Sequence, residues 1–358
     1  MNYLKTQAGW YVGLSVLMLL TGFVFVCRVF AYASDLPENA PPLVYAVALI
    51  AVALVGVAIK YSRLQAQPNV HWILVVAAVV LAMLPSLFPS IELYAVATGS
   101  DLFACLLFLS GCILCSNAGQ CGWTAKVMLV LGGLLIVGLV VSHGNLGLAL
   151  VGILLASVLL CLYRRPLAGL FLLIGTIAFL GTAIVARPYR LHHVQRILTH
   201  SEPGSPHVLA LQSMQTGGVV GSTRSMPTQE SAAQVCIDTA PAFEQLLCQG
   251  NNGEFTFVVI GSWYGLVGMI LVILSFALLA FMVVRTVRKA GLEAMTYLLV
   301  VWGGAVILLA MFHILYNVGL FFWPIPLPFF SSSGPIILTV CIAAGIMGYV
   351  EQRHAVIN

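Results

Sequence analysis

The sequence predicts an all-α integral membrane protein, a polytopic bundle of about ten transmembrane helices with one long extracytoplasmic loop. Two observations carry this prediction. The 358 residues are 61% hydrophobic and only 7% charged, with a mean hydropathy of +1.05. Apolar stretches of about 18 residues or more recur along the chain, as in transmembrane helices. Because a chain in lipid must satisfy its own backbone groups, we expect a helical bundle.

The apolar stretches divide the chain into three parts: helices 1 to 7 within residues 1–186, a loop at 187–254, and helices 8 to 10 within 255–350. The first stretch is too long for a removed signal peptide and lacks a cleavage signature, so we expect a retained anchor. The eighth and ninth are long enough to tilt or protrude. The expected spans are residues 10–31, 42–59, 70–88, 93–115, 125–141, 146–163, 168–186, 255–284, 295–322 and 331–350.

Charge placement predicts the orientation, because loops rich in Lys and Arg stay in the cytoplasm. Most acidic residues fall on the opposite side of the expected spans from most basic residues. We therefore expect a multi-pass protein with both termini in the cytoplasm and the loop from Arg187 to Gly253 outside. The net charge of +4 is then a topology signal and gives no indication of nucleic-acid binding. The basic residues on the cytoplasmic side are Lys5, Lys60, Arg63, Lys126, Arg164, Arg165, Arg285, Arg288, Lys289 and Arg353.

The nine cysteines suggest two different roles. Most lie inside expected spans, where Cys packs as a small hydrophobe. That role is also expected for the loose cluster of Cys112, Cys115 and Cys121, because no fourth zinc ligand stands at a suitable spacing. Cys236 and Cys248 both lie in the outward loop, where an oxidising compartment permits a disulfide.

Several polar residues fall within or beside expected spans. Asp101 is the acid placed furthest into hydrocarbon, so it should face a polar cavity, pair with a cation or carry a proton. Asn145 opens the sixth span, where helix capping is its simplest role. His313 and Asn317 stand four residues apart on one face of the ninth span, and interhelical hydrogen bonding is the role expected of them.

Polar groups also gather at the water-facing ends. Arg190 and Arg196, with His193, begin the outward loop, where they either bind phosphate or lie at headgroup level. The run Ser331, Ser332 and Ser333 follows a proline-rich segment and either binds an anion or caps the last helix. Glu254 ends the loop directly before an apolar helix, and is either an ordinary loop acid or a functional carboxylate that holds a cation or takes a proton.

Three ordered blocks resemble the RodA/FtsW polymerases of the shape, elongation, division and sporulation family. Asn317-Val-Gly-Leu and Pro326-Leu-Pro-Phe-Phe-Ser-Ser-Ser-Gly are similar to the family's N-I-G-M and P-L-P-F-x-S-Y-G-G-S. Glu254-Phe-Thr-Phe and Gly265-Leu-Val-Gly are similar to its T-D-F-I-F-A and E-E-L-G-L-x-G. Gly144-Asn-Leu-Gly is similar to P-D-L-G-T. A weaker block runs from Tyr189 to Val194 and continues with Gln212-Ser and Gly217-Gly.

Five electrostatic positions differ from the family pattern. Glu254 stands where the family has its catalytic Asp, and Asn145 where it has the Asp of P-D-L-G-T. The family's S-E-x-x-K corresponds to Ser100-Asp101 with Ala104, so the lysine is missing. The remaining differences are His193 in place of an Arg, and Trp263 with Tyr264 in place of paired glutamates.

The resemblance implies an inverting glycosyltransferase that polymerises lipid II at the outer face of the bacterial cytoplasmic membrane, in cell shape or division. Glu254 would act as the base, or as a ligand of Mg²⁺ or Mn²⁺. Arg190, His193 and Arg196 would steady the polyprenyl diphosphate leaving group. The implied partners are lipid II, membrane lipid and a class B penicillin-binding protein. The other expected substrate-binding residues are Asp101, Asn145, Gln212, Ser331, Ser332 and Ser333.

Two other hypotheses stay open. Replacement of the lysine, of an aspartate and of the paired glutamates favours a member of the family that has lost its chemistry and serves as a scaffold or regulator of cell-wall synthesis. Retention of a carboxylate at Glu254 favours the polymerase. The polytopic fold alone is compatible with a carrier or transporter of lipid-linked sugars, although no strong internal repeat supports this. Polymerisation of purified lipid II separates the three hypotheses.

Overall fold

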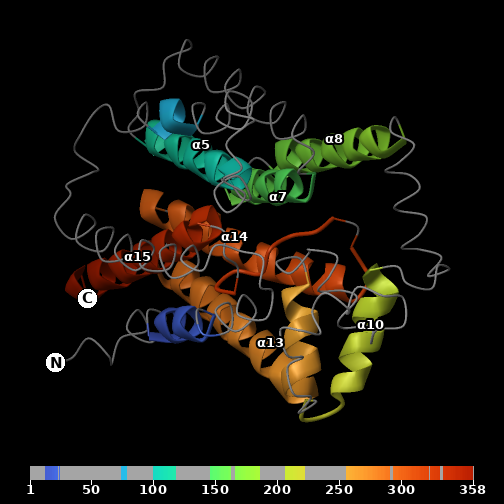
Figure 1. Cartoon of the computed structure of the whole chain (residues 1–358). Coiled ribbons are helices and arrows are strands. Elements are labelled where there is room, and N and C mark those ends of the chain that lie inside the picture. The colour runs from blue at the N-terminus through green and yellow to red at the C-terminus, as the bar shows by residue number, and fades with distance from the viewer. Residues whose placement is uncertain are drawn as a thin grey trace.

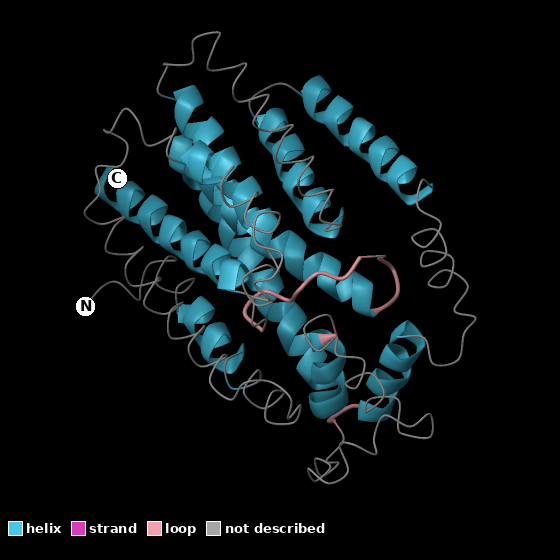
Figure 2. Ribbon diagram, turned by 45° about the horizontal axis from the view of Figure 1, so that its top comes forward, coloured by secondary structure: helices cyan, strands magenta, loops and turns pink. Residues whose placement is uncertain are grey.

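The computed structural model describes residues 13–22, 24, 74–78, 100–117, 146–162, 166–185, 206–221, 255–290, 293–321, 323–330 and 334–357. Every regular element among these residues is a helix, as the sequence predicts (Figures 1 and 2). The spans expected at 42–59 and 125–141 lie outside the described residues, and each of the other expected spans contains described helix. The labelled helices are α5 (Ser100–Asn117), α7 (Leu146–Leu162), α8 (Pro166–Val185), α10 (Pro206–Gly217), α13 (Thr256–Ala290), α14 (Ala294–Asn317) and α15 (Gly334–Ile357).

Helix α14 lies at the centre of the described bundle. It packs against α5 and α7 on one side and against α13, α15 and α10 on the other (Figure 1). The Nε1–H of Trp302 on α14 donates to the Ser110 hydroxyl on α5 over 2.9 Å. The ring of Phe103 meets Trp302 edge to face, with centroids 5.4 Å apart. A buried polar contact of this kind fixes the rotation of one helix against its neighbour.

Helix α14 ends at Asn317, five residues before the boundary expected from hydropathy, because Gly319 turns the chain. Gly319 has φ 78°, which suits glycine and strains other residues. The N–H of Leu320 donates to Leu315 O and the N–H of Gly319 to Tyr316 O, over 2.8 and 3.0 Å. This is the Schellman arrangement that closes many helices. The Asn317-Val-Gly block, one of those that carry the family resemblance, therefore contains the C-terminal end of α14.

Helix α13 differs from the single span expected at 255–284, because it is broken at Gly265. Gly265 has φ 63° and ψ −161°, a region open almost exclusively to glycine. The break frees the N–H groups of Leu266 and Val267, which donate to the carbonyls of Gly218 and Val219 over 3.0 and 3.1 Å. The chain just after α10 thus supplies the acceptors that a continuous helix would have provided.

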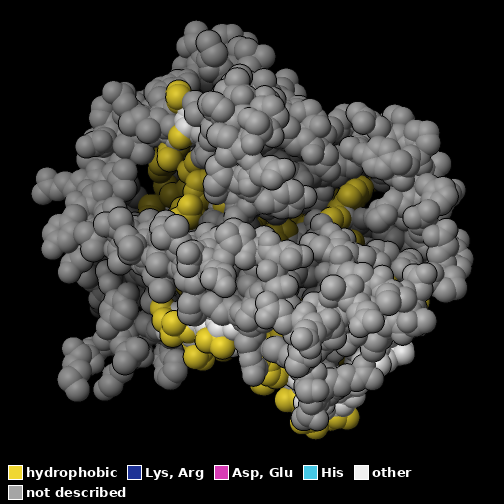
Figure 3. Space-filling view, in the orientation of Figure 1, with side chains coloured by type: hydrophobic (Ala, Val, Ile, Leu, Met, Phe, Trp, Pro, Cys, Tyr) yellow, Lys and Arg dark blue, Asp and Glu magenta, His cyan; other side chains and the backbone are white. Residues whose placement is uncertain are grey.

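Helices α13 and α14 are long and apolar enough to cross a membrane. Large apolar side chains remain exposed on α8 and on α13 after the break. On the face shown in Figure 3, the described side chains that reach the surface are mostly hydrophobic. Exposed apolar area on this scale suits contact with lipid. The exposed side chains include Leu167, Leu170, Phe171, Ile174, Ile177, Leu266, Val267, Ile270, Leu271, Leu274, Leu278, Phe281 and Val284.

Candidate functional site

The three sequence blocks meet around His313 and Ile325. Gly147 is the last residue of the Gly144-Asn-Leu-Gly block. It lies so close to the proline-rich segment that a β-carbon at Gly147 would be 3.1 Å from both Ile325 and Trp323. The carbonyl of Ile325 is hydrogen-bonded to Nδ1 of His313. Nε2 of the same ring accepts the N–H of Phe257, three residues after Glu254. One buried imidazole therefore joins the start of α13 to the proline-rich segment, and Gly147 packs against that same segment.

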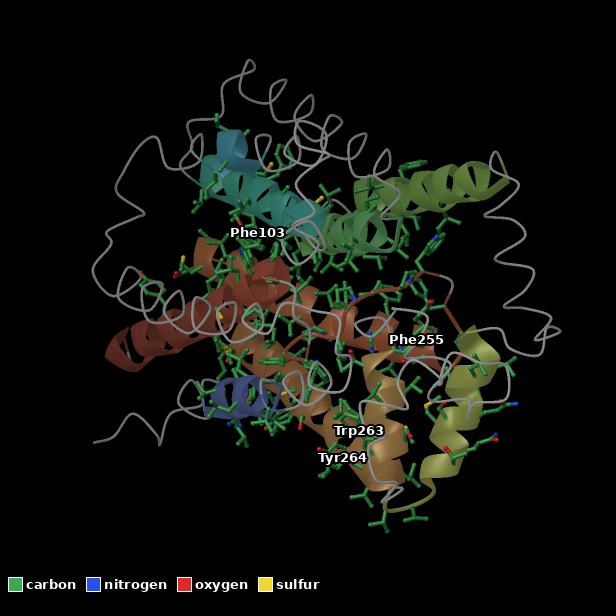
Figure 4. All side chains as sticks on the ribbon, viewed as in Figure 1. Phe103, Phe255, Trp263 and Tyr264 are labelled. Carbon is green, nitrogen blue, oxygen red and sulfur yellow. The ribbon has the colours of Figure 1, made fainter. Side chains whose placement is uncertain are left out.

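The break at Gly265 divides α13 into a first segment before it and a second segment after it. The start of the first segment is enclosed by protein. Every residue from Phe255 to Ser262 is buried, and Phe255 is 1% exposed. Its ring lies against Tyr316 of α14, with centroids 5.5 Å apart. Figure 4 shows Phe255 at the end of the first segment of α13, and Trp263 and Tyr264 at its other end, near the break.

His313 and Asn317 form the interhelical hydrogen bonds that the sequence predicts. Both side chains are fully buried. The Phe257 N–H donates to His313 Nε2 over 3.2 Å, and the Val258 N–H donates to Asn317 Oδ1 over 3.3 Å. The Asn317 amide nitrogen in turn donates to His313 O over 2.9 Å. Since Nε2 accepts a hydrogen bond, it carries no proton, and the proton of the ring lies on Nδ1, which donates to Ile325 O.

The proline-rich segment is held in an unusual backbone shape. Phe329 has φ 69°, which is uncommon for a residue with a side chain and is often found at functional positions. Its side chain is fully buried, 5.9 Å from the ring of Phe276 on α13. Its carbonyl lies so close to Gly22 that a β-carbon there would be 1.9 Å away. The first span and α13 therefore both contact this segment.

Most predicted site residues lie outside the described residues: Glu254, Asn145, Arg190, His193, Arg196, Ser331, Ser332, Ser333, Cys236 and Cys248. Glu254 and Asn145 directly precede described residues at the starts of α13 and α7. Asp101 lies in the first described turn of α5, and its side chain is outside the description. Gln212 has an exposed side chain on α10. Among the described residues, no three His, Cys, Asp or Glu side chains gather as metal ligands.

One cysteine differs from expectation. Cys115 is buried near the end of α5, as packing requires, yet it belongs to a disulfide whose other half lies outside the described residues. Cys105, Cys112, Cys161 and Cys341 are free thiols within spans, as predicted. Spacing within the cluster of Cys112, Cys115 and Cys121 gave no reason to distinguish one thiol from another.

Sequence reasoning also missed functional geometry. Helix α10 lies inside the segment treated as a loop, although Pro206 at its first position is a recognisable start signal. It packs against α13, and Gly217 approaches the Gly261 carbonyl so closely that a β-carbon would be 2.1 Å from it. The glycines at 217, 218 and 221 were the available signal. Nothing in the sequence alone pairs them with Gly265.

Comparison with known proteins identifies the architecture. No protein-family model matches the sequence, and no curated protein sequence matches it. Among solved structures, the chain is similar to one from "Structural coordination of polymerization and crosslinking by a peptidoglycan synthase complex". The two chains share 19% identity over 96% of each, with a TM-score of 0.61.

The chain is therefore an all-α polytopic membrane protein, and this prediction is confirmed. It has the fold of that peptidoglycan synthase chain. The resemblance to the shape, elongation, division and sporulation family, predicted from the three blocks, is confirmed at the level of the fold.

Proposed function

We propose that this protein is a peptidoglycan glycosyltransferase that polymerises lipid II at the outer face of the bacterial cytoplasmic membrane. The observation that carries the proposal is the meeting of the three motif blocks around His313 and Ile325. A shared fold alone does not determine function, because one fold supports many activities. Convergence of the blocks that carry the resemblance supports a common site.

In this proposal Glu254 is the general base. Its carboxylate takes the proton from the 4-hydroxyl of the acceptor sugar as the hydroxyl oxygen bonds to the anomeric carbon of the donor. The bond from that carbon to the diphosphate oxygen breaks, the configuration inverts, and polyprenyl diphosphate leaves with the electron pair. Arg190, His193 and Arg196 stabilise the charge on the leaving group. Glu254 is longer than the family's Asp by one methylene. The backbone before α13 must therefore lie correspondingly further from the substrate for the carboxylate to reach the same position.

The other substrate-binding roles follow the sequence blocks. Asn145 directly precedes α7, whose Gly147 lies beside the proline-rich segment. Ser331, Ser332 and Ser333 follow that segment in sequence, before α15. Asp101 and Gln212 complete the proposed set from α5 and α10. A divalent cation such as Mg²⁺ or Mn²⁺ would need Glu254, diphosphate oxygens and ligands outside the described residues, since the described residues offer no cluster.

The proposed topology places both termini in the cytoplasm. Arg285, Arg288 and Lys289 at the end of α13 are exposed. In this topology they would lie on the cytoplasmic side, and Glu254, which precedes α13, would lie on the outer side. A class B penicillin-binding protein would act as partner, and Cys236 with Cys248 would form a disulfide ahead of Glu254.

A non-catalytic scaffold for cell-wall synthesis is the second candidate. The structure places Trp263 and Tyr264 at the break in α13, where the family pattern has two glutamates. Tyr264 is 41% exposed, so this end of the segment presents an aromatic ring in place of negative charge. That change favours a role without chemistry.

Lipid II polymerisation separates the two candidates. The purified full chain should make glycan from lipid II with a class B transpeptidase present, measured with and without Mg²⁺ or Mn²⁺. Glycan formation supports the polymerase. A stable complex with the transpeptidase that makes no glycan under either condition supports the scaffold.

A further inference from the structure

The residue at the N-cap of α13 has a side chain that cannot accept a hydrogen bond. Its first helical hydrogen bond runs from the Val259 N–H to Phe255 O over 3.0 Å, which makes Phe255 the N-cap residue. The next N–H groups of a helix lack partners within the helix, and Ser, Thr, Asp or Asn at the N-cap usually supplies the acceptor. Phe255 has no acceptor to offer.

Helix α14 supplies the missing acceptors. His313 Nε2 accepts from Phe257, and Asn317 Oδ1 accepts from Val258, at the two positions an N-cap side chain would serve. Both side chains are fully buried, as are Phe257 and Val258. Water is therefore a poor substitute, and an unmade bond would leave a buried N–H unsatisfied. The cap of α13 thus belongs to a different helix.

The same imidazole also ties down the proline-rich segment. Its Nδ1–H donates to Ile325 O while its Nε2 accepts from α13. Asn317 is oriented in turn by its bond to His313 O. The pair therefore sets the separation between the backbone that follows Glu254 and the segment that leads to Ser331.

We propose that His313 and Asn317 are positioning residues for Glu254: they cap α13 from α14 and thereby fix the backbone from which the carboxylate projects. This inference rests on the proposed role of Glu254.

The test compares variants of the full chain in complex with a class B transpeptidase, with lipid II as substrate. His313→Ala should lower kcat about 10- to 100-fold with KM changed less than about twofold, because misplacing a reacting group by about 1 Å can cost about a hundredfold. Asn317→Ala should lower kcat in the same direction. His313→Gln should restore most of kcat, since its amide carries one acceptor and one donor at a similar reach.

Ser110→Ala is the matched control. It removes another buried hydrogen bond of α14, from Trp302 to Ser110. Trp302 lies three turns before His313 on α14, about 16 Å along the helix. It should lower thermal stability without changing kcat. A loss of kcat in His313→Ala no greater than in Ser110→Ala, or a His313→Gln variant as slow as His313→Ala, would overturn the positioning role.

Hydrogen exchange of the peptide covering residues 255–264 tests the cap without requiring activity. Exchange should be faster in His313→Ala than in wild type, and unchanged in Ser110→Ala. If the wild type makes no glycan, the proposed function fails and the positioning role fails with it, while faster exchange still supports the cap. Equal exchange in His313→Ala and Ser110→Ala overturns the cap itself, whatever the wild type does.

Discussion

The two segments of α13 are neighbours in sequence and similarly apolar. The first is buried within the protein, whereas many side chains of the second are exposed. From Phe255 to Ser262 every residue is buried. After Gly265, side chains such as Leu266, Leu271 and Phe281 are exposed. The second segment alone, from Leu266 to Ala290, extends roughly 37 Å at about 1.5 Å per residue, enough to cross the hydrocarbon core.

The difference shows that hydrophobicity serves two purposes in one helix. In the second segment it provides a surface for lipid. In the first it fills the protein interior, where α14 accepts the N–H groups of Phe257 and Val258. Just beyond the break, the chain after α10 accepts the N–H groups of Leu266 and Val267. The first segment is therefore positioned by protein contacts, and Glu254 immediately precedes it.

The largest effect on folding is expected from Gly265→Ala. A side chain at φ 63° and ψ −161° costs about 1–3 kcal/mol in backbone strain. Its β-carbon would also lie 2.4 Å from the Gly221 nitrogen and 2.5 Å from Val219 O. The two segments should lose their junction, and thermal unfolding in detergent should show a large drop or no folded protein.

Gly175→Ala on α8 is the control for that substitution. No other group lies near a β-carbon at Gly175, and the backbone there is helical. Alanine should be neutral or slightly stabilising. Equal stabilities of the two variants would contradict a break that depends on glycine.

Two adjacent leucines in the second segment sharpen the contrast between packed and lipid-facing positions. Leu279 is fully buried and Leu278 is 44% exposed. Leu279→Ala should lower the free energy of unfolding by about 2–3 kcal/mol through lost packing. Leu278→Ala should cost about 0.5 kcal/mol or less. Similar losses, measured by thermal unfolding, would mean that another element covers the exposed face.

A smaller effect than those of Gly265→Ala and Leu279→Ala is expected at the end of α14, near the residues that cap the first segment. Gly319→Ala places a side chain at φ 78° and should cost about 1 kcal/mol. Gly319→Asn should cost less, because Asn tolerates this conformation better. An alanine variant as stable as wild type would show that this stop is not needed to hold Asn317 in place.

The sequence was sufficient for the long apolar helices that the structure describes, and insufficient for α10 and for the helix junctions. Apolar length alone predicts α7 and α8 within a few residues, and the four-residue spacing of His313 and Asn317 predicts that they act together. The break at Gly265 was missed because the apolar run continues through it. The N–H groups freed by the break donate to the carbonyls of Gly218 and Val219, which lie more than forty residues earlier in the chain. Such pairings arise from tertiary contacts that a local pattern does not contain.

The candidate site follows the same division. Sequence blocks predict which residues matter, including Glu254 and the proline-rich segment. That Ile325 meets Gly147, or that His313 reaches Phe257, depends on how α14 packs between α7 and α13. Sequence resemblance predicted that the blocks share a function, and their contact in the structure supplies a physical basis for it.

The central claim is that the buried first segment of α13 serves to hold Glu254 for catalysis. Polymerisation of lipid II by the purified chain with its transpeptidase partner, compared between wild type and Glu254→Gln, tests it most directly. Glutamine keeps the size of the side chain but cannot take a proton, so activity should fall about a hundredfold or more with stability unchanged, while Glu254→Asp should retain activity. A wild type that makes no glycan, or a Glu254→Gln variant as active as wild type, would contradict the claim.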